Sequence, residues 1–274
     1  MTTIDADAFN AFEAAAWQRQ APGYDAFFGQ ITSRLTDPLL DAALVRGGGR
    51  LLDVASGPGY VAARAAERGA EVVGVDMADA MLALARASYP EIEFRHADAE
   101  ALPFPDGSFD AVVANFLVLH LGRPEQVISE FARVIAPGGR LALTAWDFPE
   151  RARFLGVIRE AVAAAGATPP ADIPAGPDIF RFSDEDEFAG LLRGAGLESV
   201  EVRTVAFTHP VASSQQLWDG LLGGTVRTAA LILDQPDETR NRIRAEFDQL
   251  VNVYQRGDHL EMPVSVKLAA GRKR

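Results

Sequence analysis

The chain has 274 residues, of which 48% are hydrophobic and 23% charged, and its formal net charge is −12. This composition is typical of a globular protein with a sizeable core, and the negative charge argues against nucleic-acid binding through a basic surface. The sequence has no cysteine, which excludes disulfides, thiolate nucleophiles and cysteine metal sites. Neither a signal-peptide pattern nor an apolar run of membrane-spanning length is visible, so we expect a cytoplasmic protein.

The first predicted element is a helix over residues 1–22, in which aromatic and alanine side chains recur at helical spacing. Pro22-Gly23 is expected to end this helix, because proline and glycine are poor helix formers. A short helix over Leu39–Val45 is expected next. Asp37-Pro38 precedes it, as a capping residue followed by a proline often does.

The central motif is GGRLLDVASGPGY, residues 48–60. An apolar strand with an acid near its end runs into a turn of small residues, after which a helical pattern begins. Gly57 and Gly59 tolerate positive φ and allow the backbone to approach a ligand closely, whereas Ala55 is expected to keep a negative φ. The helix N-terminus offers unpaired N–H groups to an anionic group. Strand, turn and helix in this order predict a nucleotide site.

Four more strands are predicted along the following part of the chain: Glu71–Asp76, Ile92–Ala97, Asp110–Asn115 and Arg140–Trp146. The first three end at a polar side chain, namely Asp76, Asp98 and Asn115. In a doubly wound fold such strand ends meet at the sheet edge where nucleotides bind. Asp76 lies 17 residues after Gly59, where an acceptor for ribose hydroxyls is expected.

Together with Pro137-Gly138-Gly139 before the fifth strand, this ordered set resembles the class I S-adenosylmethionine (SAM)-dependent methyltransferases. The likeness is greatest to the small-molecule branch that includes the ubiquinone/menaquinone-biosynthesis methyltransferases, and it covers roughly residues 15–147. The resemblance implies an α/β fold with a Rossmann-like seven-stranded methyltransferase sheet, an antiparallel last strand and a helical substrate cover. It also implies SAM as the methyl donor.

The resemblance assigns the SAM contacts to Tyr24, Asp53, Ala55, Ser56, Gly57, Gly59, Asp76, Met77, Asp98, Ala99, Asn115 and Phe116. Asp53 is expected to face the cationic end of SAM, Asp76 the ribose, and Asp98-Ala99 the adenine. Other interpretations stay open: Asp53 could cap loop N–H groups, Asp76 could cap the next helix, and Tyr24 and Met77 could pack in the core.

His120 lies one helical turn beyond the predicted site and is a candidate general base for an oxygen or carbon nucleophile. A histidine satisfied by bonds at a helix start is the alternative interpretation. The other three histidines have no spacing that suggests a metal site.

Beyond Trp146 the pattern continues with helices predicted over Phe154–Ala165, Ser183–Ala195, Ser213–Gly223 and Asp237–Gln255, and with strands over Ser199–Phe207 and Met262–Ala269. Ser183 is the expected N-cap of its helix. We therefore divide the chain into an N-terminal helical cover (1–35), a SAM-binding core (36–147), a lid insertion (148–182), and a C-terminal part of the core (183–274) with a helical cover insertion at 208–258.

The sequence predicts a SAM-dependent methyltransferase that methylates O, N or C of a small organic acceptor, acting as a monomer or homodimer. An NAD(P)-dependent oxidoreductase is an alternative, because residues 57–62 satisfy G-x-G-x-x-A. That alternative explains neither Asp53 before the loop nor Asp98-Ala99. A non-catalytic SAM-binding protein is a further alternative. Aromatic residues of the predicted cover point to an aromatic or lipophilic acceptor, unless they fill the cover's own core.

Overall fold

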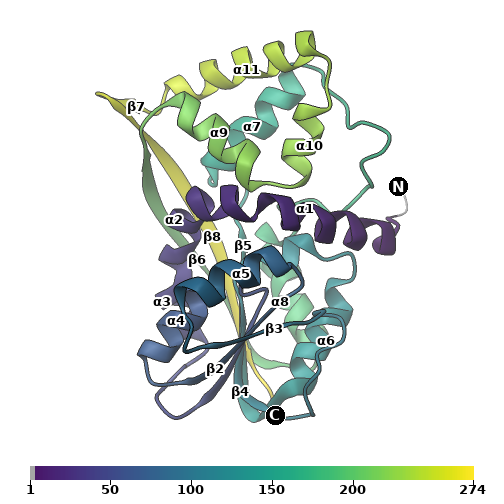
Figure 1. Cartoon of the computed structure of the whole chain (residues 1–274), viewed down its shortest axis with the longest axis vertical. Helices are drawn as coiled ribbons and strands as arrows, with labels where there is room; N and C mark the ends of the chain where they lie inside the picture. The colour runs from purple at the N-terminus through teal and green to yellow at the C-terminus, as the bar shows by residue number, and fades with distance from the viewer. Residues whose placement is uncertain (1–3) are drawn as a thin grey trace.

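The computed structural model describes residues 4–274 and contains one mixed sheet beneath a group of helices (Figure 1). Seven strands of this sheet are hydrogen-bonded side by side in the order β3-β2-β1-β4-β5-β8-β6. The strands are β1 (Arg50–Val54), β2 (Glu71–Asp76), β3 (Glu93–His96), β4 (Phe109–Ala114), β5 (Ile135–Trp146), β6 (Glu198–Val211) and β8 (His259–Arg272). β8 runs antiparallel to both of its neighbours, β5 and β6, and the other neighbouring pairs in this order are parallel. The predicted seven-stranded sheet with an antiparallel last strand is confirmed, and a two-residue strand, β7 (Gln255–Arg256), pairs with β8.

Helices cover both faces of the sheet, because its parallel strands carry apolar side chains on both sides. Leu51 of β1 packs in one core with α3 (Thr36–Ala42) and α4 (Tyr60–Glu67). Its neighbour Leu52 packs in another core with α6 (Pro124–Val134) and α8 (Glu185–Gly194). α5 (Asp79–Ser88) packs beside α4 around Phe94 of β3. The helices on the two faces therefore leave open the edge of the sheet at which the carboxyl ends of the parallel strands lie.

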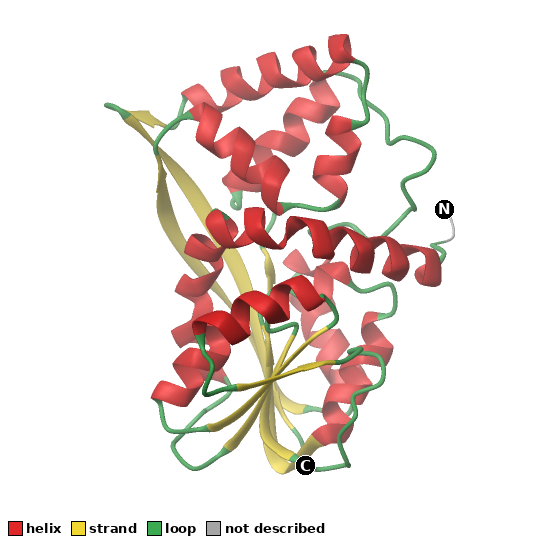
Figure 2. Cartoon of the chain, viewed as in Figure 1, coloured by secondary structure: helices red, strands yellow, loops and turns green. Residues whose placement is uncertain are grey.

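A second group of helices lies beyond that edge (Figure 2). It comprises α1 (Ala6–Ala26), α2 (Phe28–Thr32), η1 (Ser33–Leu35), α7 (Arg153–Ala164), α9 (Ser214–Gly224), α10 (Arg227–Leu233) and α11 (Asp237–Asn252). Apolar side chains join α2, α7, α9 and α11 to β6 and β8, which extend past the other strands toward these helices (Figure 1). We call this group the helical cover. Among residues 4–274 no helix combines the length and apolar composition that crossing a bilayer requires.

α1 crosses α9 at very short range because glycines line the contact. A Cβ built on Gly23 would lie 2.1 Å from the carbonyl oxygen of Gly223, and one built on Gly220 would lie 2.3 Å from the ring of Phe27. No side chain fits at either position without displacing a helix. The absence of side chains thus fixes how closely the N-terminal helix approaches the rest of the cover.

The first predicted helix differs from the observed one at both ends. Residues 1–3 lie outside the described residues, and α1 continues through Pro22 to Ala26. Packing of α1 against α9 and α5 outweighs the hydrogen bond that a proline inside the helix forgoes. The helix expected over Leu39–Val45 is α3, which begins at Thr36 and ends at Ala42. Asp37 makes no capping bond there; its carboxylate accepts instead from Arg64 Nε at 2.8 Å and from Arg68.

Later boundaries also differ from the sequence prediction, among them the start of α8 and the end of β6. The N-cap of α8 is Asp184, whose side chain accepts from the Glu187 backbone N–H, whereas Ser183 donates to the carbonyl of Phe180. A carboxylate accepts this bond well at the positive end of the helix. β6 continues beyond Phe207 to Val211, since it pairs with β8 over that length.

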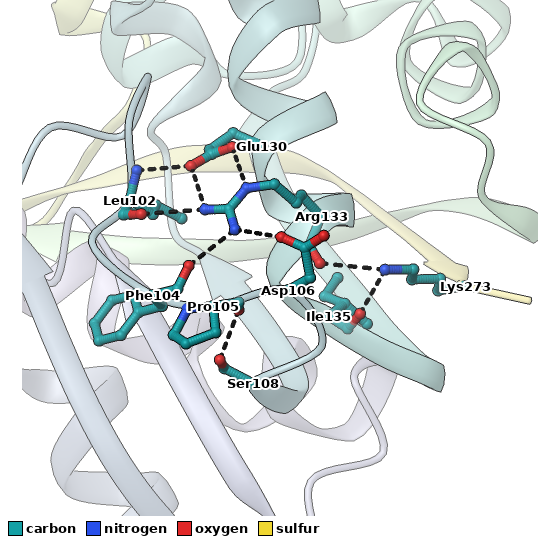
Figure 3. A network of polar contacts seen from close by, with 9 residues as sticks. All are labelled: Leu102, Phe104, Pro105, Asp106, Ser108, Glu130, Arg133, Ile135 and Lys273. Carbon is teal, nitrogen blue, oxygen red and sulfur yellow. Dashed lines mark hydrogen bonds and ion pairs between the residues drawn. The ribbon is translucent and has the colours of Figure 1, made fainter.

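The loop between β3 and β4 is held by a polar network centred on Arg133 of α6 (Figure 3). The guanidinium donates to the carbonyls of Leu102 and Phe104 at 3.1 and 2.8 Å, and to Asp106 and Glu130. These bonds fix the loop that follows Asp98-Ala99. Two further short 3-10 helices are η2 (Val118–His120) and η3 (Arg181–Ser183).

Candidate active site

The turn after β1 adopts left-handed backbone at three positions. φ is +53° at Gly57 and +92° at Gly59, as the sequence predicts. Ala55 also has a positive φ, +55°, so the expectation of a negative φ there is wrong. The turn holds it in place, because the next residue, Ser56, donates its backbone N–H to Val75 of β2 at 3.0 Å. This conformation costs a non-glycine residue roughly 1–2 kcal/mol, a strain of the kind found at ligand sites.

Asp53 is buried near the end of β1, and one of its two carboxyl oxygens lacks a hydrogen-bond partner in the described part of the chain. Its side chain is 1% exposed, and Oδ2 has no hydrogen-bond partner among residues 4–274. Burial raises the pKa of the Asp53 carboxyl to about 8, the backbone N–H of Ala62 opposes the rise, and the Asp76 charge adds to it. The Oγ of Ser56 is buried and unpartnered in the same part of the described chain. Both atoms are free for a ligand.

Asp76 ends β2 and joins the loop to the start of α5. Its Oδ2 accepts from the Gly57 N–H and its Oδ1 from the Ala78 N–H, both at 2.9 Å. Burial raises its pKa, while those backbone N–H groups act against the rise. Each carboxylate oxygen can accept a further bond. The carboxylate therefore caps backbone N–H groups, and it keeps acceptor capacity for hydroxyl groups as well.

The two residues expected at the adenine position lie after β3. Asp98 is exposed, and its Oδ1 accepts from the backbone N–H of Glu100 at 2.8 Å. Ala99 follows it and is half-buried. Met77 is 37% exposed, so it is not packed in a core as the alternative held. An exposed acceptor beside an apolar side chain and a backbone N–H suits a flat heterocyclic base.

Asn115 and Phe116 follow β4 and are tied to the cover and to β5. The Asn115 amide donates to the Thr32 carbonyl at 3.1 Å and accepts from the Thr144 hydroxyl at 2.7 Å. Phe116 has a φ of +59° and stacks on Trp146 with ring centroids 3.9 Å apart. These contacts hold the junction of sheet and cover rigidly.

Tyr24 reaches the same region from α1. Its hydroxyl donates to Thr32 Oγ1 at 3.1 Å, and its ring stacks on Phe28. Burial raises the pKa of Tyr24 to about 12, so the phenol stays protonated at neutral pH.

His120 is joined to a buried acid that the sequence did not single out. Its Nδ1 lies 2.9 Å from Oε2 of Glu13, a residue of α1 that is 3% exposed. Trp17 Nε1 donates to the same oxygen at 3.2 Å, and Arg227 Nε of α10 lies 3.8 Å from the other oxygen. The histidine is satisfied by a side chain rather than by a helix start.

One cavity brings the predicted residues together. Of the predicted site residues it is lined by Tyr24, Asp53, Ala55, Ser56, Gly57, Asp76, Met77, Asp98, Ala99, Asn115, Phe116 and His120. Gly59 does not line it and serves the turn, since a Cβ there would lie 2.9 Å from the Phe94 ring. The cavity holds about 1570 Å³, including the part open to solvent. Residues of the strand ends and of the helical cover therefore face one common cavity.

Sequence reasoning missed Glu13, Trp17 and Arg227, which also line the cavity. The spacing of Glu13 and Trp17, four residues apart on a predicted helix, was a usable signal, because it places an acid beside an aromatic donor. Arg227 had no such signal, since it reaches the cavity only through the packing of α10.

Comparison with known proteins agrees with this geometry. A family model described as a methyltransferase domain matches residues 52–143. A demethylmenaquinone methyltransferase of Renibacterium salmoninarum is 32% identical over 205 residues, which cover 70% of this chain and 86% of the relative. One from Thermus thermophilus is 46% identical over 121 residues, but the match spans only 55% of that relative.

Solved structures show the same fold. The YcgJ protein from Bacillus subtilis superimposes with a TM-score of 0.56 at 20% identity, covering 88% of this chain and 98% of that one. A Haemonchus contortus phosphoethanolamine N-methyltransferase 2, in complex with SAM, has a TM-score of 0.57 at 17% identity and covers 97% and 60% of the two chains. With the extensive sequence match to the Renibacterium protein, these findings show that the chain belongs to the class I SAM-dependent methyltransferases.

Proposed function

We propose that this methyltransferase acts on a small aromatic acceptor of the quinol type, at a carbon or an oxygen of its ring. Several relatives of this chain are named demethylmenaquinone methyltransferases, which supports this acceptor class. The cavity supports it as well, because aromatic side chains line it, among them Trp17, Phe116 and Trp146. One observation carries the proposal: a single cavity contains a buried acid with an unpartnered oxygen, Asp53, and a histidine held by another buried acid, Glu13.

The residues of the strand ends fit SAM. SAM carries an ammonium and a sulfonium, and a buried carboxylate without a partner is stabilised by a positive charge. Asp53 would therefore bind its cationic end, and Asp76 would accept from the ribose hydroxyls. Asp98 and the Ala99 N–H would bind the adenine, with Met77 against its face. Bound there, SAM supplies a methyl group already activated by the sulfonium charge.

The part of the cavity in which the acceptor would bind is formed by the helical cover and η2. Glu13 would accept a hydrogen bond from the Nδ1–H group of His120, which leaves Nε2 as the basic nitrogen of the ring. His120 then takes the proton from the acceptor hydroxyl, and the carbon or oxygen nucleophile gains electron density. Apolar walls of the cavity exclude water and hold the acceptor in line with the methyl group. Alignment of this kind supplies several kcal/mol of rate acceleration.

Methyl transfer to 1,4-naphthoquinol tests the proposal. The purified protein, incubated with SAM and the chemically reduced ring, is expected to release S-adenosylhomocysteine together with a monomethylated ring. Mass spectrometry measures both products. The variant H120A is expected to lower kcat at least 100-fold, the usual contribution of a general base, while SAM affinity by calorimetry stays unchanged. Tight SAM binding with no methylated product from quinol, phenol or amine acceptors would instead establish a non-catalytic SAM-binding protein.

A further inference from the structure

Glu13 is a buried acid whose charge needs compensation. Its Oε2 lies 2.9 Å from His120 Nδ1 and accepts from Trp17 Nε1 at 3.2 Å, whereas its Oε1 lies 3.8 Å from Nε of Arg227. A carboxylate taken out of water is costly unless a positive charge lies beside it. Two side chains beside Glu13 can supply that charge: the imidazole of His120, if it is protonated, and the guanidinium of Arg227.

Arg227 is held next to Glu13 by three parts of the cover. It belongs to α10, its guanidinium donates to the carbonyl of Pro177, and its Cζ lies 5.2 Å from the centroid of the Phe9 ring of α1. Its side chain is 21% exposed. Burial lowers the pKa of Arg227, and the charges of Glu13 and Asp178 act against that lowering. A guanidinium keeps its proton throughout the neutral pH range, so this positive charge is permanent.

Other charged groups on the elements around η2 are paired among themselves. These pairs are Arg123 with Glu100, at 3.2 Å, and Arg181 of η3 with Glu125 and Glu187, at 2.9 and 2.6 Å. The strand β5, which also packs against η2, has no charged residue from Leu141 to Trp146. The acids of the strand ends that line the same cavity are Asp53, Asp76 and Asp98. Among the residues 4–274 that line this cavity, Arg227 is the one lysine or arginine.

We propose that Arg227 is a positioning residue: its permanent positive charge compensates Glu13, so that His120 stays neutral and able to accept a proton. Without Arg227, the charge of Glu13 would favour the protonated imidazole, which cannot act as a base. Glu13 would then orient the ring of His120 and also disable it. This inference rests on the proposed function, in which His120 is the base, and it names the group that keeps this base in its active protonation state.

Titration of the His120 imidazole followed by NMR tests the inference without an activity assay. H120Q assigns its signal among the four histidines. R227M removes a positive charge, which stabilises the protonated ring, so the titration midpoint of His120 is expected to rise by about one pH unit, as for one charge several ångströms away at a partly buried site. R227K keeps the charge and is expected to restore the wild-type midpoint.

Three further variants complete the test. E13Q is expected to lower the midpoint, and E13Q/R227M is expected to titrate close to the wild type, because the two opposite charges are both gone. R159M is the matched control, since Arg159 is 51% exposed and pairs with Asp178 at 2.9 Å rather than with Glu13. It is expected to leave the midpoint unchanged. R227Q, which keeps a donor for the Pro177 carbonyl, replaces R227M if that variant does not fold.

The pH profile of methyl transfer gives a second readout. On the acidic limb of the profile, kcat/KM of R227M is expected to be about tenfold lower than that of the wild type, because more of the His120 population is protonated. At higher pH, where His120 is neutral in both proteins, the two values are expected to converge. A role of Arg227 in packing alone would lower the rate at every pH.

The outcomes distinguish this inference from the proposed function. An unchanged titration midpoint in R227M, or an equal rise in R227K, overturns the inference, and methyl transfer by the wild type can still stand in that case. A rate of R227M that is lower at every pH, with an unchanged midpoint, overturns it as well. The expected shifts of the midpoint without methyl transfer to any acceptor refute the proposed reaction but support the compensation of Glu13 by Arg227.

Discussion

Two acids at neighbouring strand ends are in opposite situations. Asp76 is buried, yet two backbone N–H groups bind its carboxylate. Asp53 is buried with an unpartnered oxygen and a pKa of about 8. A site that keeps an uncompensated carboxyl loses folding stability, and the ligand that supplies a positive charge recovers it. We therefore regard Asp53 as a residue maintained for binding at a cost to the ligand-free protein.

The stability cost of Asp53 predicts a pH-dependent effect of D53N. The pKa of Asp53 in the folded protein, about 8, lies above the ordinary value of 3.8. The contribution of this group to the free energy of unfolding is therefore greatest below about pH 4 and is lost as pH rises toward 8. The melting temperature of ligand-free D53N is therefore expected to exceed that of the wild type by an amount that grows between pH 5 and pH 8. SAM is expected to bind D53N more weakly at pH 8. A D53N protein that is less stable than the wild type at pH 8 contradicts this prediction; D79N, at an exposed acid, is the control.

Removing the Asp76 carboxylate should weaken the binding of SAM. D76A is expected to lower SAM affinity by roughly 1–3 kcal/mol, the loss of hydrogen bonds between a carboxylate and the ribose hydroxyls. Isothermal calorimetry with SAM measures the change. D79A is the matched control, because Asp79 begins α5 three residues later and is 73% exposed. If D76A retains wild-type affinity, Asp76 does not bind the ribose.

At the scale of elements, α1 provides one wall of the site. Glu13, Trp17 and Tyr24 lie on one side of this helix and line the cavity, and Glu13 connects α1 to η2 through His120. The helix continues past Pro22, and this continuation carries Tyr24 to Thr32. An element outside the sheet thus completes the site that the strand ends begin.

The contact between α1 and η2 predicts how Glu13 acts. E13Q removes the charge that orients His120 and is expected to lower kcat about tenfold, while SAM affinity measured by calorimetry stays unchanged. Because Glu13 acts through His120, the double variant E13Q/H120A is expected to be no slower than H120A. D7N, at an exposed acid of the same helix, is the control. Additive losses in the double variant would show that Glu13 acts independently of the histidine.

At the scale of the whole molecule, the sheet and the donor half of the site could be predicted from the sequence. An acid or an amide after an apolar run indicates where each strand ends, and the order of Asp53, Asp76 and Asp98 along the chain favours a bound nucleoside at those ends. The same order, with family membership, decides against the NAD(P)-dependent oxidoreductase that residues 57–62 allowed.

The residues that α1 and α10 contribute to the cavity could not be predicted in the same way. Glu13 and Arg227 are more than 200 residues apart in the sequence, and only the packing of α1 against the C-terminal helices brings them together. The backbone of Ala55 was not predictable for a related reason. Its positive φ is imposed by the bond of Ser56 to the neighbouring strand, and no local preference of alanine indicates it.

The glycine contact between α1 and α9 also sets the position of one wall of the cavity. With only 2.1 Å between the carbonyl oxygen of Gly223 and the place where a Cβ on Gly23 would stand, the two helices touch backbone to backbone. Sliding one along the other would bring bulkier neighbours into that gap. A side chain at Gly23 would therefore force α1 away from α9 and displace Glu13, Trp17 and Tyr24, the residues of α1 that line the cavity.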